Sequence, residues 1–161
     1  MEFLIQEGCG ERFDSLLRLL GECDGDFVPP ISSRPEGIAG YAGFLWDERL
    51  VLAVTDHGDV AGVLSYIPDF RADDGGKVAY VTTLCVLPGL RGRGIARRLY
   101  GLVETHARND RVMLSTWSTN KAQLHLMEAL GYSERRRVRD ARGRGVDTIV
   151  FEKTLGLPTA T

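Results

Sequence analysis

The chain has 161 residues, the size of one domain with a single substantial core. Hydrophobic residues make up 43% and charged residues 26%, which is typical of a globular protein in water, and no apolar run reaches the roughly 20 residues of a membrane span. The formal net charge of −2 gives no general attraction to nucleic acid, so neither nucleic acid nor a membrane is expected as a partner.

The N-terminal part of the chain predicts a strand followed by two helices. Residues 3–7 form the strand, and apolar side chains at helical spacing predict a helix over 11–20 that Gly21 could end. The Gly-, Pro- and Ser-rich stretch 24–35 predicts a loop, and 36–46 has the apolar and aromatic residues of a second helix.

Three strands are predicted in the middle of the chain. Residues 50–54 and 60–67 read as antiparallel strands, because the polar, glycine-containing stretch 56–59 between them suits a hairpin turn. A charged loop is expected over 68–76, beginning at a proline, and the next strand over 77–86.

The C-terminal part predicts two helices and three strands. They are expected at residues 95–107 (helix), 111–116 (strand), 121–130 (helix), 133–139 (strand) and 146–151 (strand). Gly131 ends the second of these helices. The order βααβββαβαββ predicts an α/β protein with one mixed, mostly antiparallel sheet flanked by helices, as a single domain over 1–154 with a tail at 155–161.

The termini and the cysteines bear on location and metal binding. The first residues are acidic rather than basic and lack a signal-peptide core, so a cytoplasmic protein is expected. Cys9, Cys23 and Cys85 follow no zinc-site spacing, and an odd number does not suit a disulfide framework. Reduced thiols and no bound metal are therefore expected.

Residues 81–96 are the most informative segment. An apolar, β-branched strand runs through a Pro-Gly turn into a loop with Arg91, Gly92, Arg93 and Gly94, and a helix follows at once. Such a junction gathers unpaired backbone N–H groups and the positive end of a helix dipole at one point. The two glycines let an anion approach the backbone closely, and the two arginines add charge. This pattern predicts a pyrophosphate-binding loop.

The loop spacing matches neither a nucleotide P-loop nor a dinucleotide fingerprint. The run Arg91-Gly92-Arg93-Gly94-Ile95-Ala96 instead resembles the Arg/Gln-x-x-Gly-x-Gly/Ala loop of the GNAT family of acyl-CoA-dependent N-acetyltransferases. Residues 84–88 resemble the fourth strand of that family. The order of elements is similar over nearly the whole chain, although the specific motifs are confined to 81–132.

A second segment, 120–132, resembles the family's Asn-x-x-Ala-x-x-Leu-Tyr-x-x-x-Gly-Phe motif. The resemblance implies that Asn120 contacts the pantetheine or phosphate part of CoA, and its position also suits a helix N-cap. The family's tyrosine, which protonates the departing thiolate, is replaced by Met127, which cannot donate a proton. Because a thiol has a pKa of about 8.5, we expect this loss to slow the reaction rather than abolish it.

The resemblance implies acetyl-CoA as the co-substrate and a set of residues that would hold it. These are Leu84, Cys85, Val86, Arg91, Gly92, Arg93, Gly94, Ile95, Ala96, Arg97 and Asn120. Negative charge on the reacting carbonyl oxygen would be stabilised by a backbone N–H of the fourth strand, here that of Cys85 or a neighbour.

The acceptor site and the general base are less defined. The resemblance places Tyr41, Trp46, Ser115 and Trp117 where an acceptor could bind, and simple packing explains the aromatic ones equally well. No acidic residue lies in either strand that usually supplies the base, so the base comes from elsewhere or from water.

Four residues are considered as the base, and His125 is carried forward as a catalytic residue. The other three are His57, Tyr80 and Glu134. Arginines crowd the last hairpin, over 135–144, and three interpretations stay open: a charged edge strand, recognition of an acidic acceptor or the CoA 3′-phosphate, and contact with nucleic acid.

The resemblance thus implies an N-acetyltransferase that moves the acetyl group of acetyl-CoA directly to a primary amine of a small molecule or to an exposed amine of a peptide or protein. The alternative is an acyl-CoA-binding regulatory or sensor module with weak turnover, which the missing tyrosine and carboxylate favour. Whether the chain forms a homodimer stays open.

Overall fold

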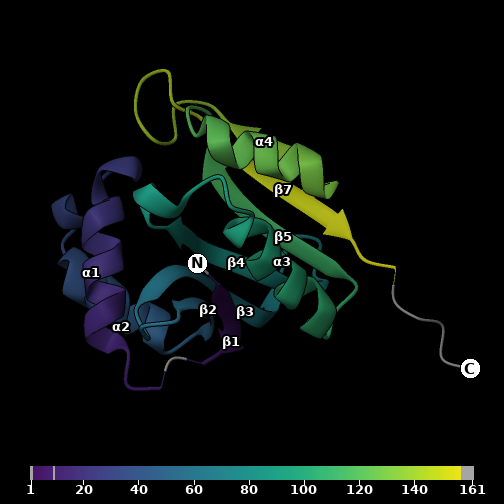
Figure 1. The fold of residues 1–161 in the computed structure, drawn as a ribbon. Helices are drawn as coiled ribbons and strands as arrows, with labels where there is room; N and C mark the ends of the chain where they lie inside the picture. Colours follow the sequence, from purple (N-terminus) through teal and green to yellow (C-terminus); the bar gives the residue numbers. More distant parts are fainter. Residues whose placement is uncertain (1, 9, 157–161) are drawn as a thin grey trace, which may run out of the picture. The chain divides into compact units, whose positions relative to one another are not determined.

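The computed structural model of the chain describes residues 2–8 and 10–156, so Cys9 and the tail from residue 157 lie outside the described residues. Eleven strands and helices follow one another in this part of the chain (Figure 1). They are β1 (Phe3–Glu7), α1 (Phe13–Cys23), α2 (Gly37–Trp46), β2 (Arg49–Thr55), β3 (Val60–Arg71), β4 (Lys77–Val86), α3 (Ile95–His106), β5 (Arg111–Trp117), α4 (Lys121–Leu130), β6 (Ser133–Val138) and β7 (Thr148–Thr154).

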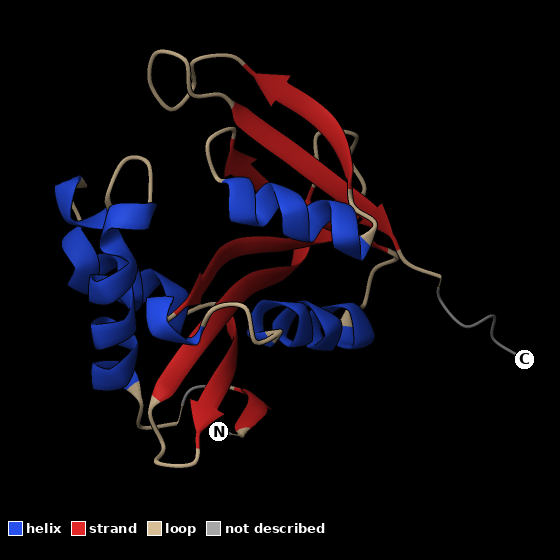
Figure 2. Cartoon of the chain, turned by 45° about the horizontal axis from the view of Figure 1, so that its top comes forward, coloured by secondary structure: helices blue, strands red, loops and turns tan. Residues whose placement is uncertain are grey.

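The seven strands form one sheet in the order β1-β2-β3-β4-β5-β7-β6 (Figure 2). Strands β4 and β5 pair in parallel, with Ala79 opposite Val112, whereas β1–β2, β2–β3, β5–β7 and β6–β7 pair antiparallel. The predicted order of elements and the mixed, mostly antiparallel sheet are confirmed. No helix in the described ranges combines the length and apolar character needed to cross a membrane.

The contacts divide the chain into two compact units. The first comprises Met1–Tyr66 and Thr82–Val103, and the second comprises Ile67–Val81 and Glu104–Thr161. Strands β3 and β4 each contribute residues to both.

In the first unit, helices α1 and α2 pack against each other, and their ends are joined by the ring of Phe13 edge-on to Trp46 at 5.0 Å. Helix α3 packs directly on the sheet at Gly62 of β3. A side chain there would lie 3.1 Å from Ile95 and 3.2 Å from the carbonyl oxygen of Cys85, so only glycine allows this close approach without a shift of its neighbours. The end of β4 and the start of α3 are thereby fixed next to each other.

In the second unit, a charged cluster joins the β3–β4 turn to β5, β6 and β7. Arg111 binds Asp74 at 2.7 Å and Glu152 at 2.9 Å, and Arg135 binds Glu152 at 3.0 Å and Asp73 at 3.0 Å. The Arg111 hydrogen bond is the main reason that the pKa of Asp74 lies well below its ordinary value.

Three predicted element ends are wrong by three residues or more, those of α1, β3 and β7, and β7 runs to Thr154 rather than to residue 151. Helix α1 continues through Gly21 to Cys23, because Gly21 keeps an ordinary helical backbone and the side chain of Cys23 is buried. Strand β3 continues through Pro68 to Arg71, where a loop over 68–76 was expected. The ring of Phe70 packs on Tyr80 of β4 at 4.6 Å and stabilises the longer hairpin, while the Pro68 carbonyl accepts a hydrogen bond from Asn109 at 2.7 Å.

Candidate active site

The loop between β4 and α3 has the backbone conformation that its sequence predicts. Gly92 and Gly94 both have φ of +78°, in the left-handed region that favours glycine. A Cβ built at either position meets nothing within 4 Å, so the space above both glycines is open. The first backbone bond of α3 runs from Arg98 N–H to the Gly94 carbonyl at 3.1 Å, and the N–H groups before it have no partner within the helix. The loop therefore fits a diphosphate.

The side chain of Arg91 turns toward the protein. Its Nε donates to the Val86 carbonyl at 3.0 Å, and its Nη2 lies 2.6 Å from the Asp26 carboxylate and 3.8 Å from the Cys23 sulfur. Arg91 thus ties the loop to the end of β4 and to the segment after α1. Arg93 and Arg97 are exposed on the same loop and helix start.

Cys85 lies on β4 with its side chain buried, while its backbone belongs to the segment predicted to stabilise negative charge. A hydrogen bond with Cys23, together with burial, raises the pKa of the Cys85 thiol well above its ordinary value. The thiol therefore stays protonated near neutral pH and is unsuited to be a nucleophile.

Tyr41 of α2 reaches β4, as an acceptor-site residue should. Its hydroxyl lies 2.5 Å from the Thr83 hydroxyl, and the guanidinium of Arg34 stacks 5.4 Å from the centre of its ring. Burial raises the pKa of Tyr41, so its phenol stays protonated and can donate a hydrogen bond. Trp46, by contrast, packs against Phe13, which is the packing role considered for it.

The sequence did not reveal one carboxylate that contacts β4 next to Thr83. Glu48, which lies between α2 and β2, accepts a hydrogen bond from the Thr82 hydroxyl, and Thr82 shares a hydrogen bond of 2.7 Å with Ser65. Among the acids outside β4 and β5, the sequence pattern pointed to Glu134 and not to Glu48. Glu48 is 34 residues from Thr82 in sequence, and no local pattern reveals that pairing.

In the second unit, Asn120 forms the N-cap of α4. Its Oδ1 accepts the Gln123 N–H at 3.3 Å, and its Nδ2 donates to the Thr116 hydroxyl at 3.2 Å. Met127, on the same helix, is fully buried, so a tyrosine at this position would first have to fit into the core. His125 is exposed on the helix surface.

Ser115 and Trp117 lie on β5. The Ser115 hydroxyl accepts a hydrogen bond from Tyr80 of β4 at 3.1 Å. The ring of Trp117 is covered by the Arg142 guanidinium, whose centre lies 5.2 Å away. Both side chains therefore have protein partners that an acceptor would have to join or displace.

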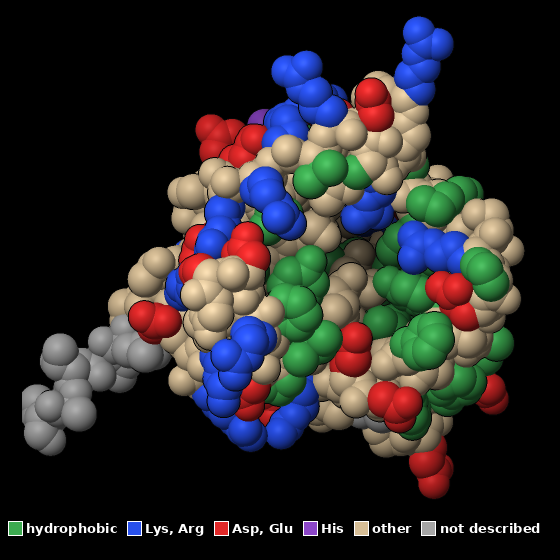
Figure 3. All heavy atoms as spheres, turned by 180° about the vertical axis from the view of Figure 1, so that it is seen from behind, with side chains coloured by type: hydrophobic (Ala, Val, Ile, Leu, Met, Phe, Trp, Pro, Cys, Tyr) green, Lys and Arg blue, Asp and Glu red, His purple; other side chains and the backbone are tan. Residues whose placement is uncertain are grey.

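Three arginines of the last hairpin, Arg135, Arg136 and Arg137, pair with acids of the second unit. Arg135 forms ion pairs with Asp73 of the β3–β4 turn and with Glu152 of β7. Arg137 forms ion pairs with Glu134 at 3.1 Å and with Asp147 at 3.1 Å. Lys and Arg side chains also lie beside Asp and Glu over the face shown in Figure 3. These pairs favour the charged edge strand among the three interpretations.

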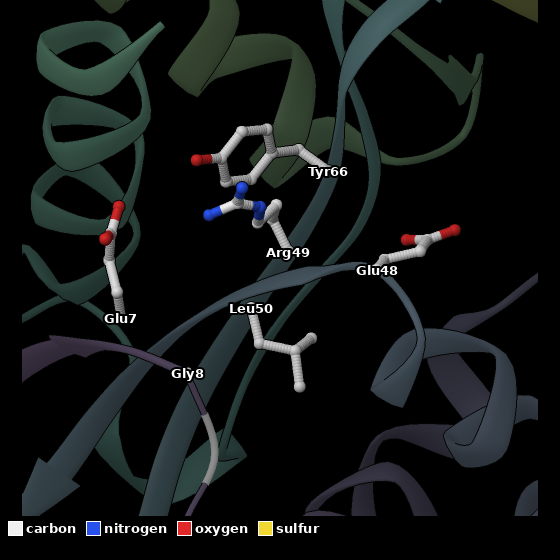
Figure 4. A pocket seen from close by; sticks show the side chains of 6 residues that line it. All are labelled: Glu7, Gly8, Glu48, Arg49, Leu50 and Tyr66. Carbon is white, nitrogen blue, oxygen red and sulfur yellow. The ribbon is translucent and has the colours of Figure 1, made fainter.

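A pocket of about 130 Å³ lies at the start of β2 in the first unit (Figure 4). Its lining residues are Glu7, Gly8, Glu48, Arg49, Leu50 and Tyr66. Arg49 and Tyr66 lie next to each other in it, and the Glu48 carboxylate points away from both. None of the loop residues 91–97 lines this pocket, so it is separate from the predicted diphosphate site.

A mixed sheet whose fourth strand leads through a left-handed glycine loop into a helix is the fold of an acyl-CoA-binding transferase. The sequence model of the acetyltransferase (GNAT) family matches residues 13–132, about three quarters of the chain. The chain therefore belongs to the GNAT family, whose members are acetyl-CoA-dependent acetyltransferases. No curated protein matches the sequence.

Solved structures with a similar fold include three whose names bear on function. An aminoglycoside 6′-N-acetyltransferase complexed with coenzyme A is 18% identical, with a TM-score of 0.78 over 98% of this chain and 99% of that one. The yncA protein of Salmonella typhimurium, with its cofactor acetyl-CoA, is 16% identical, with a TM-score of 0.77 over 100% and 98%. An N-acetyltransferase from Staphylococcus aureus Mu50 is 14% identical, with a TM-score of 0.79 over 97% and 100%. At these identities the likeness shows the fold.

Proposed function

We propose that the protein transfers the acetyl group of acetyl-CoA to a primary amine of a small molecule or to an exposed amine of a peptide or protein. The observation that carries this proposal is the loop at the start of α3, where two glycines in the left-handed conformation leave open space above unpaired N–H groups. Two proteins of similar fold were solved with coenzyme A or acetyl-CoA, which supports the same ligand here.

In this proposal the backbone of residues 92–97 binds the diphosphate and the backbone of 84–86 binds pantetheine, while a contact of Asn120 with CoA remains what the family resemblance implies. Acetyl-CoA supplies a reactive thioester carbonyl. The N–H groups of 84–86 are donors for the negative charge that develops on the carbonyl oxygen. Positioning of the acceptor next to that carbonyl supplies much of the remaining rate enhancement.

Release of CoA is compatible with the buried Met127, although methionine cannot donate a proton to the departing sulfur. A proton donor at that position makes the reaction faster but is not essential, because a thiolate is a good leaving group near neutral pH. The alternative function, a sensor that binds acyl-CoA with little turnover, is favoured by the same Met127.

Release of free thiol from acetyl-CoA in the presence of a panel of amines tests the proposal. The panel includes alkylamines, polyamines, amino acids, peptides and aminoglycosides, the last because a protein of similar fold is named for them. We expect acceptor-dependent release with at least one amine. Binding of acetyl-CoA measured by calorimetry without release on any amine would instead support the sensor.

A further inference from the structure

We propose that Glu48 is the general base of the acceptor site, and that its carboxylate first binds the ammonium group of the acceptor. This inference rests on the proposed function and adds the residue that was missing from β4 and β5.

The hydrogen bonds direct Glu48 toward the reacting part of β4. The Ser65 hydroxyl of β3 can donate to the Thr82 hydroxyl at 2.7 Å, and Thr82 donates in turn to the Glu48 carboxylate. Thr82 precedes Leu84 by two residues on the same strand, which is about 7 Å at the rise of a β-strand. The carboxylate is therefore fixed close to the backbone proposed to stabilise the carbonyl oxygen.

The negative charge of Glu48 also acts on Tyr41 of the proposed acceptor site. Burial is the main cause of the raised pKa of Tyr41, and the negative charge of Glu48 adds to it, as expected for neighbouring groups. Tyr41 in turn contacts Thr83, the residue after Thr82. Successive side chains of a strand point to opposite faces, so Glu48 at Thr82 and Tyr41 at Thr83 approach the same short stretch of β4 from its two faces.

Within the described residues, the carboxylate of Glu48 has no cationic partner. The cationic neighbour in sequence, Arg49, points to the other side of the strand together with Tyr66 (Figure 4). Glu7 lines the same pocket as these two, also away from the Glu48 carboxylate. A half-buried carboxylate that accepts one neutral hydrogen bond retains oxygen lone pairs for an ammonium group.

The other bases considered in the sequence are less suitable. His57 and His125 are exposed, and Glu134 is held by Arg137 at 3.1 Å. Tyr80 donates its hydroxyl to Ser115 at 3.1 Å.

Transfer of the acetyl group follows removal of a proton from the acceptor. An N–H proton of the bound ammonium moves to a Glu48 oxygen, and the freed nitrogen lone pair forms the C–N bond with the thioester carbonyl carbon. The attack places the carbonyl π pair on the oxygen, and its return to the carbon breaks the C–S bond, whose electron pair leaves with the sulfur. The attacking nitrogen gives up a second N–H proton to the thiolate, which leaves a neutral amide and a free thiol, and the proton on Glu48 passes to solvent.

Glu48→Gln tests the role with little disturbance of the fold, because the amide oxygen still accepts the Thr82 hydrogen bond. With the best amine of the panel we expect kcat/KM to fall by about 100-fold or more, the usual contribution of a general base. Asp47→Asn is the matched control, since it removes the same charge from an exposed neighbour, and it should change kcat/KM by less than twofold.

Two readouts separate a base from a structural residue. The alkoxyamine analogue of the acceptor is uncharged at neutral pH and needs no deprotonation before attack, so Glu48→Gln should lose at least tenfold less kcat/KM with it. In Glu48→Gln only the unprotonated fraction of the amine can react, so its kcat/KM should keep rising with pH over the whole range below the pKa of the amine. A kcat/KM within threefold of wild type, or equal losses with both nucleophiles, would overturn the proposal.

Binding distinguishes failure of this proposal from failure of the proposed function. Calorimetry with CoA should give the same affinity for wild type, Glu48→Gln and Asp47→Asn. If no amine of the panel is acetylated, binding of n-butylammonium to the CoA-saturated protein is followed by NMR. Binding at least tenfold weaker in Glu48→Gln than in Asp47→Asn supports the ammonium site even without turnover, and equal binding in both overturns it.

Discussion

Substitution of Gly94 tests the proposed diphosphate loop in two ways, through the stability of the fold and through the affinity for CoA. At φ of +78° an L-residue costs about 1–2 kcal/mol, while the open space around the position adds no clash. For a chain of this length that cost lowers the melting temperature of Gly94→Ala by about 2–8 °C. A bound diphosphate would additionally lose about one charge-assisted hydrogen bond, worth about 1.5–3 kcal/mol, which weakens binding roughly 10- to 150-fold.

The assay is calorimetric titration of CoA into folded wild type, Gly94→Ala and Gly94→Val, with melting temperatures measured in parallel. Gly89→Ala is the matched control, because Gly89 lies in the same connection, is equally open and has no positive φ. We expect Gly89→Ala to bind CoA as wild type does and Gly94→Val to bind most weakly. A folded Gly94→Val with a dissociation constant within threefold of wild type would refute the assignment of the loop.

Three further outcomes are expected. Arg91→Ala should weaken CoA binding several-fold by freeing the loop, whereas Asp26→Asn should cost less than about 1 kcal/mol of stability because the ion pair is half exposed; equal CoA affinity in Arg91→Ala would contradict a positioning role. The pKa of Asp74 in the folded protein is depressed, chiefly by the Arg111 hydrogen bond, so its stabilisation is present above its ordinary pKa of 3.8 and is lost as the pH falls below it. The difference in melting temperature between wild type and Asp74→Asn should therefore be largest near pH 6 and shrink toward pH 3, and a difference independent of pH would exclude this linkage. Asn120→Ala should lower the free energy of unfolding by about 1 kcal/mol, and Asn120→Asp, which keeps the cap, should not; if Asn120→Asp nevertheless weakens CoA binding, the amide has a role beyond capping.

Local signals predicted much of the fold and part of the site. Asn120 and Gly131 bound helix α4 as expected, Asn120 by capping it and Gly131 by its φ of +83°. Gly92 and Gly94 likewise take the conformation that the loop pattern requires. Each of these features depends on residues within about one helical turn, so a single sequence contains the information that determines them.

Contacts between distant segments decided the rest. Periodicity shows which face of a strand or helix is apolar, but it does not give the register and order in which strands pair, and these bring side chains together. Helix α1 continues past its glycine because the side chain of Cys23 is buried, and β3 continues past its proline because the ring of Phe70 packs on Tyr80. The sequence by itself determined the conformation of the glycine loop before α3 and the order of elements, whereas only the tertiary structure placed Glu48 against Thr82, because that contact depends on the alignment of three strands.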